Sequence, residues 1–526
     1  MVVPFGLEDR PAEQRRAVAT LRLNDGVPLA IIGAARSGRT GALSAVAASV
    51  ARRFAPTEVQ VYAIDAGARA LGDLEESPNV GAVVFRDELD RLGRLVMRLA
   101  EELDRRIQTL ALHRRRDIAA QREAEPDAPW PYMAVLIDRW DLLTEEAEVS
   151  DDRTLVSTLE RLVTEGGRAG ILVVATGDRS MLTGRATALF PDRLVLRLAD
   201  AYDYVSAGLS GPPGRGEPGR GWRAPEGVET QVAEAGVDAV GDAEGETGVP
   251  DRVVPWSRGG PFRIDRLPVL VTRDDVTELV EAMALERAET RSADVPVVLG
   301  EPVEGRSGSA GALLVAVGGD ELGPRSIDVD EHGPCALVTG RRRTGRSGVL
   351  VAMVESALEG GWEVAVVTAR RSPLTRLPAV YPRVHGPFRH DEDAPELAEV
   401  VRRALREGRR LLVVADDVDL LPEGALADEL ASLPQRMRDT GSFFVGSGEA
   451  EEILASFRGP APALRRARCG VMLAPQGTEE GDAFGVRLRR GQYGRALGVG
   501  AGYLVLDGLA ERVQVVRSDL LPAPGL

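Results

Sequence analysis

The sequence contains no lysine, because all 65 of its basic residues are arginine. Phosphate-binding loops normally use a lysine to reach the β- and γ-phosphates of a nucleotide, and its absence excludes that arrangement here. Arginine is planar and bulkier than the ammonium group that it would replace. A coding bias toward GC-rich codons also accounts for the pattern, since Ala, Gly and Val are abundant as well.

Cysteine, aromatic residues and long apolar runs are also scarce. Two cysteines in 526 residues exclude a disulfide-stapled fold and favour a reducing compartment, and the apolar stretches around Cys335 and Cys469 predict buried strands. Aromatic residues make up 4% of the chain, so the cores must consist of Leu, Val and Ala. We find no signal-peptide pattern and no apolar run of about 18 residues. We therefore expect a cytoplasmic chain that reaches a membrane only through a partner.

The net charge of −16 argues against a surface that coats nucleic acid, although it leaves room for a local basic channel. The length suits two large domains or about three of average size. Hydrophobic residues make up 44% of the chain, which is enough for large packed cores. Composition thus indicates a large packed protein without a surface that coats nucleic acid. The chemistry has to be sought in the motifs.

One motif occurs twice, each time between an apolar strand-like run and an apolar helix start. Its pattern is Gly-x-x-x-x-Gly-Arg-[Ser/Thr], at 33–40 and again at 340–347. Glycines let such a loop point its N–H groups at phosphate oxygens, and the helix N-terminus adds positive charge. The candidate nucleotide-binding residues are Gly33, Ser37, Gly38, Arg39 and Thr40 in the first copy, and Gly340, Thr344, Gly345, Arg346 and Ser347 in the second.

Each loop is followed later in the chain by an apolar strand that ends in an acid. Asp138 ends one of these strands and Asp416 ends the other. The loop hydroxyls of Thr40 and Ser347, together with these carboxylates, are the ligands that would hold Mg²⁺. Asp138, Asp416 and Asp417 are the candidate catalytic residues.

The residue after the strand acid differs between the copies. Arg139 follows Asp138, at the position where a motor ATPase normally has a catalytic Glu, and a guanidinium cannot act as a general base. Asp417 follows Asp416 and is acidic but shorter than Glu. If either site hydrolyses ATP, the sequence predicts that it is the second.

The order of the predicted elements repeats along the chain. Strand, loop, helix and acid-ended strand recur with a period of roughly 300 residues, far longer than a solenoid repeat. This predicts an α/β fold of two tandem RecA-like P-loop NTPase domains, residues 1–292 and 293–526, with mainly parallel sheets flanked by helices. Residues 210–262 are rich in Gly, Pro and acid and predict a surface loop or linker. We expect the helix within 265–292 to pack back on the first domain.

Two further helices are predicted in the first domain. A polar lead-in is expected to hold a short helix near 11–21. Apolar residues at spacings of three and four predict a long amphipathic helix from about 87 to 113, which the second copy lacks.

The chain resembles the FtsK/SpoIIIE superfamily, and specifically the C-terminal half of the EccC-type multi-ATPase proteins of type VII secretion in actinobacteria. The likeness covers almost the whole chain. The run 173–179 resembles the family's sensor strand, and the run 193–198 also matches the family. This resemblance implies sensor or arginine roles for Thr176, Arg179 and Arg193. The other stretches that carry the likeness are 4–11, both loops, the acid-ended strands, 218–221 and 473–487.

In this family the first, membrane-proximal module is usually the motor, whereas later modules bind nucleotide and regulate, and the last often receives the substrate. The resemblance implies ATP and Mg²⁺ as cofactors. It implies as partners a membrane-bound secretion or translocation machinery, a competent motor ATPase module and small helical secreted substrates at the second domain. It also implies a ring-forming homo-oligomer. The motor module, its membrane helices and a DNA-reading winged-helix tail are not found in the sequence.

Three hypotheses follow. The leading one is an ATP-binding, hydrolysis-impaired, regulatory and substrate-receiving tandem module of a type VII secretion-like ATPase. The second is an ATP-dependent DNA translocase of the FtsK/SpoIIIE type. The third is a scaffold whose loops bind no nucleotide. The net acidity, the missing lysines and Arg139 favour the first over the second.

Overall fold

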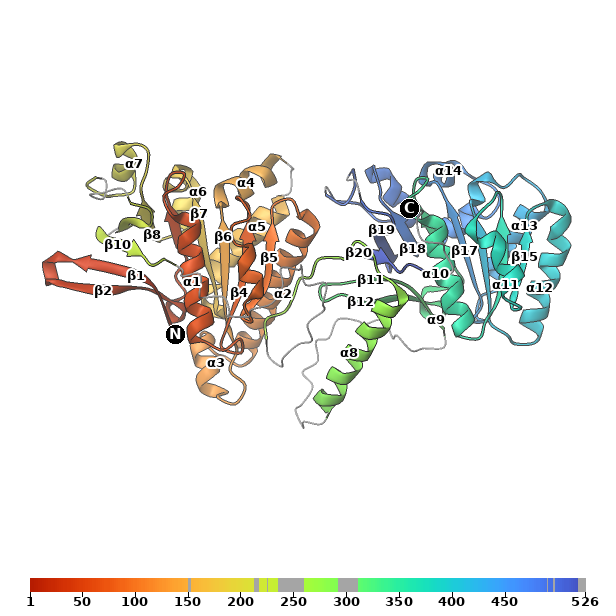
Figure 1. Ribbon diagram of the computed structural model, residues 1–526, viewed down its shortest axis with the longest axis horizontal. Coiled ribbons are helices and arrows are strands. Elements are labelled where there is room, and N and C mark those ends of the chain that lie inside the picture. The colour runs from red at the N-terminus through yellow and green to blue at the C-terminus, as the bar shows by residue number, and fades with distance from the viewer. Residues whose placement is uncertain are drawn as a thin grey trace. The chain divides into compact units, whose positions relative to one another are not determined.

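The computed structural model describes residues 1–149, 153–211, 217–224, 226–234, 260–291, 311–489, 491–494 and 497–518. They form two compact units (Figure 1). The first unit ends at Asp265 and the second begins at Arg266. Among the described residues, no helix is long and apolar enough to cross a lipid bilayer.

The first unit is built on a ten-stranded sheet with the order β2-β1-β10-β9-β8-β3-β7-β6-β4-β5. The six strands from β8 to β5 are parallel to one another, whereas β9, β10, β1 and β2 pair antiparallel with their neighbours. The strands are β1 (Val2–Arg10), β2 (Arg15–Arg22), β3 (Leu29–Ile32), β4 (Val59–Asp65), β5 (Val80–Phe85), β6 (Tyr132–Asp138), β7 (Ile171–Gly177), β8 (Asp192–Leu196), β9 (Arg220–Ala224) and β10 (Val228–Val232).

Helices cover both faces of this sheet. Alternate strand residues face opposite sides, so that Leu29 and Ile31 pack with α1 while Ala30 and Ile32 pack with α2 and α5. Each fully buried Val, Leu or Ile contributes about 1.5–3 kcal/mol to stability. The helices are α1 (Arg39–Arg53), α2 (Leu89–Leu112), α3 (Ile118–Ala124), α4 (Trp140–Val149), α5 (Arg153–Glu165), α6 (Gly184–Leu189) and α7 (Ala201–Ser206).

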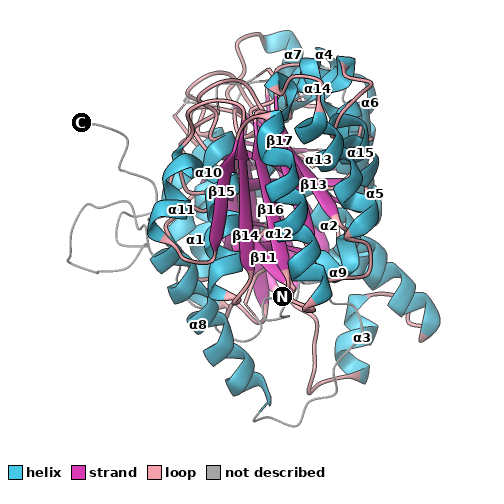
Figure 2. Ribbon diagram, turned by 90° about the vertical axis from the view of Figure 1, so that its right-hand side faces the viewer, coloured by secondary structure: helices cyan, strands magenta, loops and turns pink. Residues whose placement is uncertain are grey.

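The second unit repeats the sheet strand for strand, in the order β12-β11-β20-β19-β18-β13-β17-β16-β14-β15. Its strands also lie between two layers of helices, as Figure 2 shows. The strands are β11 (Ala312–Gly318), β12 (Gly323–Asp328), β13 (Cys335–Thr339), β14 (Glu363–Thr368), β15 (Val384–Phe388), β16 (Leu411–Asp416), β17 (Phe443–Gly448), β18 (Gly470–Leu473), β19 (Ala501–Leu506) and β20 (Leu509–Val515).

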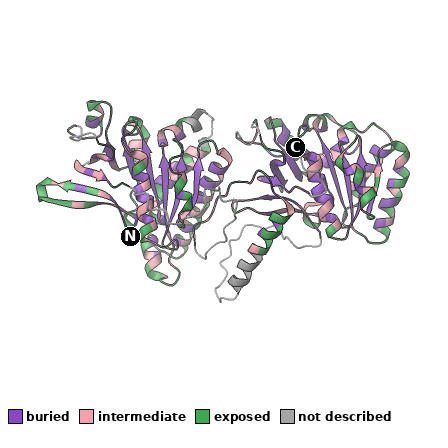
Figure 3. Ribbon diagram, in the orientation of Figure 1, coloured by how far each residue is buried: buried purple, intermediate pink, exposed green. Residues whose placement is uncertain are grey.

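The helices of the second unit divide between the two faces in the same way, with α10 on one face and α12, α13 and α15 on the other. The central strands β13, β14, β16, β17 and β18 are buried, whereas the outer helix faces are exposed (Figure 3). The helices are α8 (Arg273–Arg291), α9 (Val329–His332), α10 (Arg346–Glu359), α11 (Leu377–Val380), α12 (Ala394–Arg406), α13 (Ala425–Arg436), α14 (Ala450–Ala455) and α15 (Ala461–Ala467).

The predicted α/β fold with two mainly parallel sheets flanked by helices is confirmed. Both loops join a strand to a helix: β3 to α1, and β13 to α10. The long helix predicted from 87 to 113 is α2, and the shorter α12 follows β15 where α2 follows β5. Both cysteines are buried; Cys335 opens β13, and Cys469 directly precedes β18.

The short helix predicted near 11–21 is wrong, because β1 and β2 form an antiparallel hairpin there. Val3 and Phe5 of β1 are buried, and so are Ala19 and Leu21 of β2. Alternate residues of a strand share one face, so this spacing of two is the signal of a half-buried hairpin. The polar residues at the hairpin turn obscured it.

The helix α8 packs on the second unit, and the prediction that it packs on the first is wrong. Val276 and Leu279 of α8 form an apolar cluster with Val317 and Val516. The amide of Arg517 donates to the carbonyl of Val271, 2.7 Å away, just before the helix. The boundary expected at residue 292 therefore differs from the division near residue 265.

The loop predicted at 210–262 is described only in part. The prediction is wrong for residues 220–224 and 228–232, which form β9 and β10 and connect β8 to β1 within the first sheet. Most of its acidic stretch, 235–259, lies outside the described residues.

Candidate nucleotide-binding sites

The first loop leaves β3 at Ile32 and enters α1 at Arg39. Gly38 has a φ of 97°, in the left-handed region that favours glycine, and the matching Gly345 of the second loop has a φ of 112°. Neither α1 nor α10, both fully described, has a side-chain cap or an acid in its first turn. The first N–H groups of a helix have no intrahelical acceptor, so both helix ends suit an anion.

A glycine of a late hairpin fixes each loop from outside. The amide of Gly219 donates to the carbonyl of Ser37 at 2.7 Å, and the amide of Gly500 donates to the carbonyl of Thr344 at 2.8 Å. A Cβ atom added at Gly38 would lie 2.4 Å from the Gly219 nitrogen. This close approach requires glycine at position 38, independently of its φ.

The first strand acid, Asp138, accepts two hydroxyl hydrogen bonds. Thr40 of the loop donates to Oδ2 at 3.1 Å, and Thr176 at the end of β7 donates to Oδ1 at 2.6 Å. Burial raises the pKa of the Asp138 carboxyl, and the charge of Asp65 adds to this, against the hydrogen bond from Thr176. The predicted pairing of Thr40 with Asp138 is thus seen in the geometry.

The second strand acid, Asp416, has a matching set of partners. Ser347 of the loop donates to Oδ2 at 2.8 Å, and Ser447 at the end of β17 donates to Oδ1 at 2.6 Å. The hydroxyl of Ser372 also donates to Oδ2. Asp416 is 3% exposed, so these three donors are what stabilises its carboxylate.

The residues after the two strand acids, Arg139 and Asp417, have the same backbone conformation and opposite charges. Arg139 and Asp417 both have positive φ, and their amides donate to the hydroxyls of Thr176 and Ser447. The Arg139 guanidinium turns to Asp141, with its closest contact at 2.7 Å. The hydrogen bond to Asp141 raises the pKa of Arg139, against the effect of burial.

The two loop arginines have different surroundings. Arg39 makes no ion pair within the described chain, and its buried Nη1 finds no hydrogen-bond partner there. Burial lowers the pKa of Arg39, and the positive charge of Arg139 lowers it further. Arg346 is 6% exposed and donates from Nη2 to Oδ1 of Asp417 at 2.7 Å. Arg346 therefore has a carboxylate partner, Asp417, whereas Arg39 has none within the described chain.

The two units also differ at a residue that lies just past the strand next to the acid-ended strand. The parallel registers align Asp65 with Asp138 and Thr368 with Asp416, so Gly67 and Arg370 are equivalent. A Cβ atom at Gly67 would lie 2.8 Å from Oδ2 of Asp138. Arg370 instead directs its Nε to Oδ2 of Asp417. Sequence reasoning missed this arginine. Its position two residues after β14 could have indicated that it lies near the strand acid.

The three sensor candidates lie in different places. Thr176 joins the Asp138 network, as described above. Arg179 is exposed on the turn after β7. Arg193 pairs in register with Ala30, two residues before the carboxyl end of β3, so the structure does not bring it to the loop.

Arg197 lies at the loop edge instead, and sequence reasoning missed it. Its carbonyl accepts from the amide of Ala34 at 2.8 Å, and its Nη2 lies 3.4 Å from the carbonyl oxygens of Ala35 and Arg36. The signal was available, because Arg197 directly follows the strand that neighbours β3.

Both loops fit a nucleoside phosphate. The free helix N-termini, the glycine backbones and the partnerless Nη1 atoms of Arg39 and Arg346 within the described chain all suit phosphate oxygens. Among the described residues there is no group of three or more His, Cys, Asp or Glu that could hold a metal ion. A magnesium ion at Thr40 and Asp138, or at Ser347 and Asp416, would therefore depend on the nucleotide's own phosphates.

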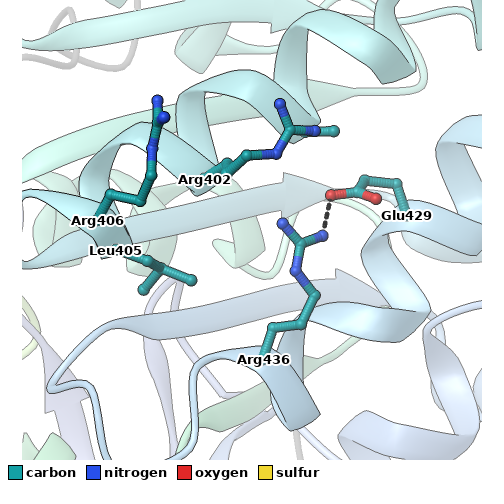
Figure 4. A pocket seen from close by; sticks show the side chains of 6 residues that line it. Arg402, Leu405, Arg406, Glu429 and Arg436 are labelled. Atoms are coloured by element: carbon teal, nitrogen blue, oxygen red, sulfur yellow. Dashed lines mark hydrogen bonds and ion pairs between the residues drawn. The ribbon is translucent and has the colours of Figure 1, made fainter.

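A groove of about 590 Å³ lies elsewhere on the second unit, between α12 and α13 (Figure 4). Arg402, Arg406 and Arg436 surround it, and Arg436 pairs with Glu429. Arg406 and Arg436 are the last residues of α12 and α13, which run back from the carboxyl edge of the sheet. The groove is therefore separate from the loop at that edge.

Residues 7–207 match the FtsK/SpoIIIE family. This part of the chain is an FtsK/SpoIIIE domain. The ESX-5 secretion system protein EccC5 of Mycobacterium tuberculosis is 25% identical over 472 residues, which cover 81% of this chain and 33% of that protein. The chain thus spans about a third of the length of the curated relatives that it first matches.

Two solved structures resemble the whole chain, including the FtsK/SpoIIIE domain. ATPases 2 and 3 of EssC from Geobacillus thermodenitrificans give a TM-score of 0.65 at 18% identity, with 98% of this chain and 96% of that chain covered. ATPases 2 and 3 of Thermomonospora curvata EccC, in complex with a signal sequence peptide, give 0.60 at 21% identity, with 98% and 93% covered. The two units therefore have the fold of the tandem ATPase domains of EssC and EccC, which are proteins of type VII secretion.

Proposed function

We propose that the chain is an ATP-binding regulatory module of a type VII secretion-like ATPase, which acts more by binding nucleotide than by hydrolysing it. One observation carries the proposal. At the position after the strand acid, which a motor ATPase uses to activate water, neither unit has an acid without an ion pair. Arg139 replaces the acid in the first unit, and two arginines neutralise Asp417 in the second.

Binding is supported by what remains at the loops. The hydroxyl and carboxylate that would hold Mg²⁺ already lie together in each unit, as Thr40 with Asp138 and Ser347 with Asp416. A bound Mg²⁺ would offset the negative charge of the phosphates. Arg39 and Arg346 stand where the loop lysine would reach the β- and γ-phosphates. They supply positive charge there, in a bulkier form.

Weak hydrolysis is supported by the charge around the missing base. Phosphoryl transfer depends on a group that orients the attacking water. Arg139 cannot accept a proton from water and directs its guanidinium to Asp141. Asp417 accepts from an arginine at each of its oxygens, which leaves fewer lone pairs for the attacking water. Of the two sites, the second is the one that would retain residual turnover.

The relatives support a proposal for the partners of this chain. We propose that a competent motor ATPase module and a membrane-bound secretion machinery work with this chain in the cytoplasm, in a ring of copies. The Thermomonospora curvata EccC structure contains a signal sequence peptide. We propose by analogy that the second unit receives small helical secreted proteins. DNA is the less favoured cargo, because the chain carries a net charge of −16.

The test is calorimetry with ATP·Mg²⁺, combined with turnover measured with and without duplex DNA. We expect binding at two sites and little turnover, unchanged by DNA. DNA-stimulated turnover would instead support a translocase. Absence of binding by the parent chain and by Arg346→Lys would leave only a scaffold. If turnover is found, its loss in Asp138→Ala but not in Asp417→Ala would contradict the ranking of the two sites.

A further inference from the structure

The second site contains an arginine–aspartate–arginine cluster: Arg346 and Asp417, which are buried, and Arg370, which is partly exposed. Oδ1 of Asp417 lies 2.7 Å from Nη2 of Arg346, and Oδ2 contacts Nε of Arg370. Arg346 and Asp417 are each 6% exposed, while Arg370 is 37% exposed. The Arg346–Asp417 pair is shielded from water, which strengthens the attraction between its two charges. The cluster therefore sets the charge at the mouth of the loop.

The backbone holds Asp417 in this place. Its φ is 57°, an uncommon value for a residue other than glycine, and its amide donates to the Ser447 hydroxyl at 3.1 Å. The first unit has no counterpart of the cluster, since Arg139 and Gly67 stand at the positions of Asp417 and Arg370. The cluster is thus specific to the second unit, although the two sheets are otherwise alike.

The carboxylate satisfies the two arginines incompletely. It has two oxygens and gives one to each guanidinium, while the buried Nη1 of Arg346 finds no partner in the described part of the chain. A terminal phosphate has three oxygens and a larger charge, and so could serve both arginines and the remaining N–H. Arg346 is also the residue that replaces the loop lysine, whose role is to reach the β- and γ-phosphates.

We propose that Asp417 stands in for the terminal phosphate, so that the second site prefers nucleoside diphosphate to nucleoside triphosphate. This inference rests on the proposed nucleotide binding and names its specificity. A β-phosphate cradled by the loop amides leaves the cluster intact. A γ-phosphate must displace Asp417 from Arg346 and Arg370 and then lie beside a carboxylate of like charge.

The experiment is calorimetry with ADP and ATP, each with Mg²⁺, on the full chain carrying Arg39→Glu. That substitution places a negative charge where the first loop would take phosphate, so the remaining binding reports the second site. In this background we expect ADP to bind more tightly than ATP. Adding Asp417→Asn should raise ATP affinity by about tenfold or more and change ADP affinity by less than about threefold.

Two further variants define the contact. Arg370→Gly, which copies Gly67 of the first unit, should remove part of the ATP gain when combined with Asp417→Asn, because the second guanidinium is then lost. Asp419→Asn is the matched control. Asp419 is a nearby half-buried acid that makes no ion pair with Arg346 among the described residues, so its substitution should leave the ratio of ADP to ATP affinity unchanged.

The outcomes separate the two proposals. Equal gains for ADP and ATP in Asp417→Asn, or no gain for either, would overturn the specificity role and leave nucleotide binding in place. A parent second site that binds ATP more tightly than ADP would overturn it too. If neither nucleotide binds to the Arg39→Glu chain or to its Asp417→Asn derivative, nucleotide binding by the second unit fails as well. Thermal unfolding of each variant confirms that it is folded.

Discussion

Arg139 and Asp417 occupy the same backbone position in the two units, one residue past the strand acid, with φ values of 66° and 57°. Each donates its amide to a hydroxyl at the end of the neighbouring strand, Thr176 or Ser447. The main chain of the site is thus the same in both units, while the side chain at its centre reverses in charge. Replacing that side chain should therefore alter chemistry more than structure.

We expect hydrolysis at the first site to recover only when Arg39→Lys and Arg139→Glu are combined. The lysine gives the loop a compact ammonium, and the glutamate gives the site an acid that can orient water. Nucleotide affinity should rise in Arg39→Lys alone, whereas turnover should rise in the double variant by far more than the two single effects predict. Single-turnover assays measure this, and additive effects would contradict it.

Gly38→Ala should abolish nucleotide binding at the first site and destabilise the first unit. Its Cβ atom would lie 2.4 Å from the Gly219 nitrogen, and its φ of 97° is strained for any residue with a side chain. The control is Gly41→Ala, three residues on, where a Cβ atom meets nothing within 4 Å of the described structure. Gly41 lies in α1, so this control should stabilise the helix by about 0.5–1 kcal/mol. Urea unfolding and calorimetry compare the two.

Asp138→Asn should stabilise the first unit while weakening its Mg²⁺-dependent nucleotide binding. Burial raises the pKa of Asp138, so the folded chain binds more protons than the unfolded chain between 3.8 and the raised value. Stability from this group is therefore lost as the pH rises through that window, and the loss persists at neutral pH. We expect a rise in Tm of about 2–4 °C, equivalent to about 1 kcal/mol.

The pH dependence provides the check on that prediction. Unfolding free energies measured from about pH 4 to about pH 8 should fall more steeply for the parent than for Asp138→Asn. Parallel curves would show that the Thr40 and Thr176 hydrogen bonds already offset the cost of burying the charge.

Arg106→Ala should destabilise the first unit by about 3–5 kcal/mol. Arg106 is 1% exposed, pairs with Glu102 at 2.6 Å and donates to the carbonyls of Pro131 and Ala169. Removing it leaves those acceptors buried without a donor. The neighbouring Arg105 pairs with the same glutamate but is 50% exposed, so Arg105→Ala should cost less than about 1 kcal/mol. Similar losses in both variants, measured by denaturant unfolding, would refute this account.

Both thiols should be unreactive in the folded chain. Burial raises the pKa of Cys335 to about 12 and that of Cys469 to about 12, and the thiolate is the reactive form. We expect a thiol reagent at about pH 8 to label neither cysteine until denaturant unfolds the second unit. Rapid labelling of either residue in native buffer would show that its strand opens locally.

The repeated motif made the fold predictable. The strands that carry the loops and acids are continuous apolar runs, and such runs are the strongest signal of buried parallel strands. The β1–β2 hairpin was missed because it is covered on only one face and its alternation involves a few residues such as Phe5 and Leu21. The placement of α8 depends on which unit buries Val276 and Leu279, and periodicity alone does not contain that information.

The candidate site was predictable where residues follow one another along the chain, and less so where they meet across strands. Thr40 and Asp138 were paired from their motifs. Arg370 and Arg197 were not found, because each reaches a loop from a different strand. The cluster around Asp417 needs the register of β14 and β16, which sequence spacing does not supply.

The hairpin contacts to the loops have a consequence for synthesis of the protein. A ribosome completes residues 33–40 long before Gly219, and residues 340–347 long before Gly500. A nascent chain that stops before Gly219 has every phosphate-binding residue of the first loop yet lacks the amide that fixes the carbonyl of Ser37. Each unit therefore gains the backbone hydrogen bond that fixes its loop only after nearly all of its sheet has been translated.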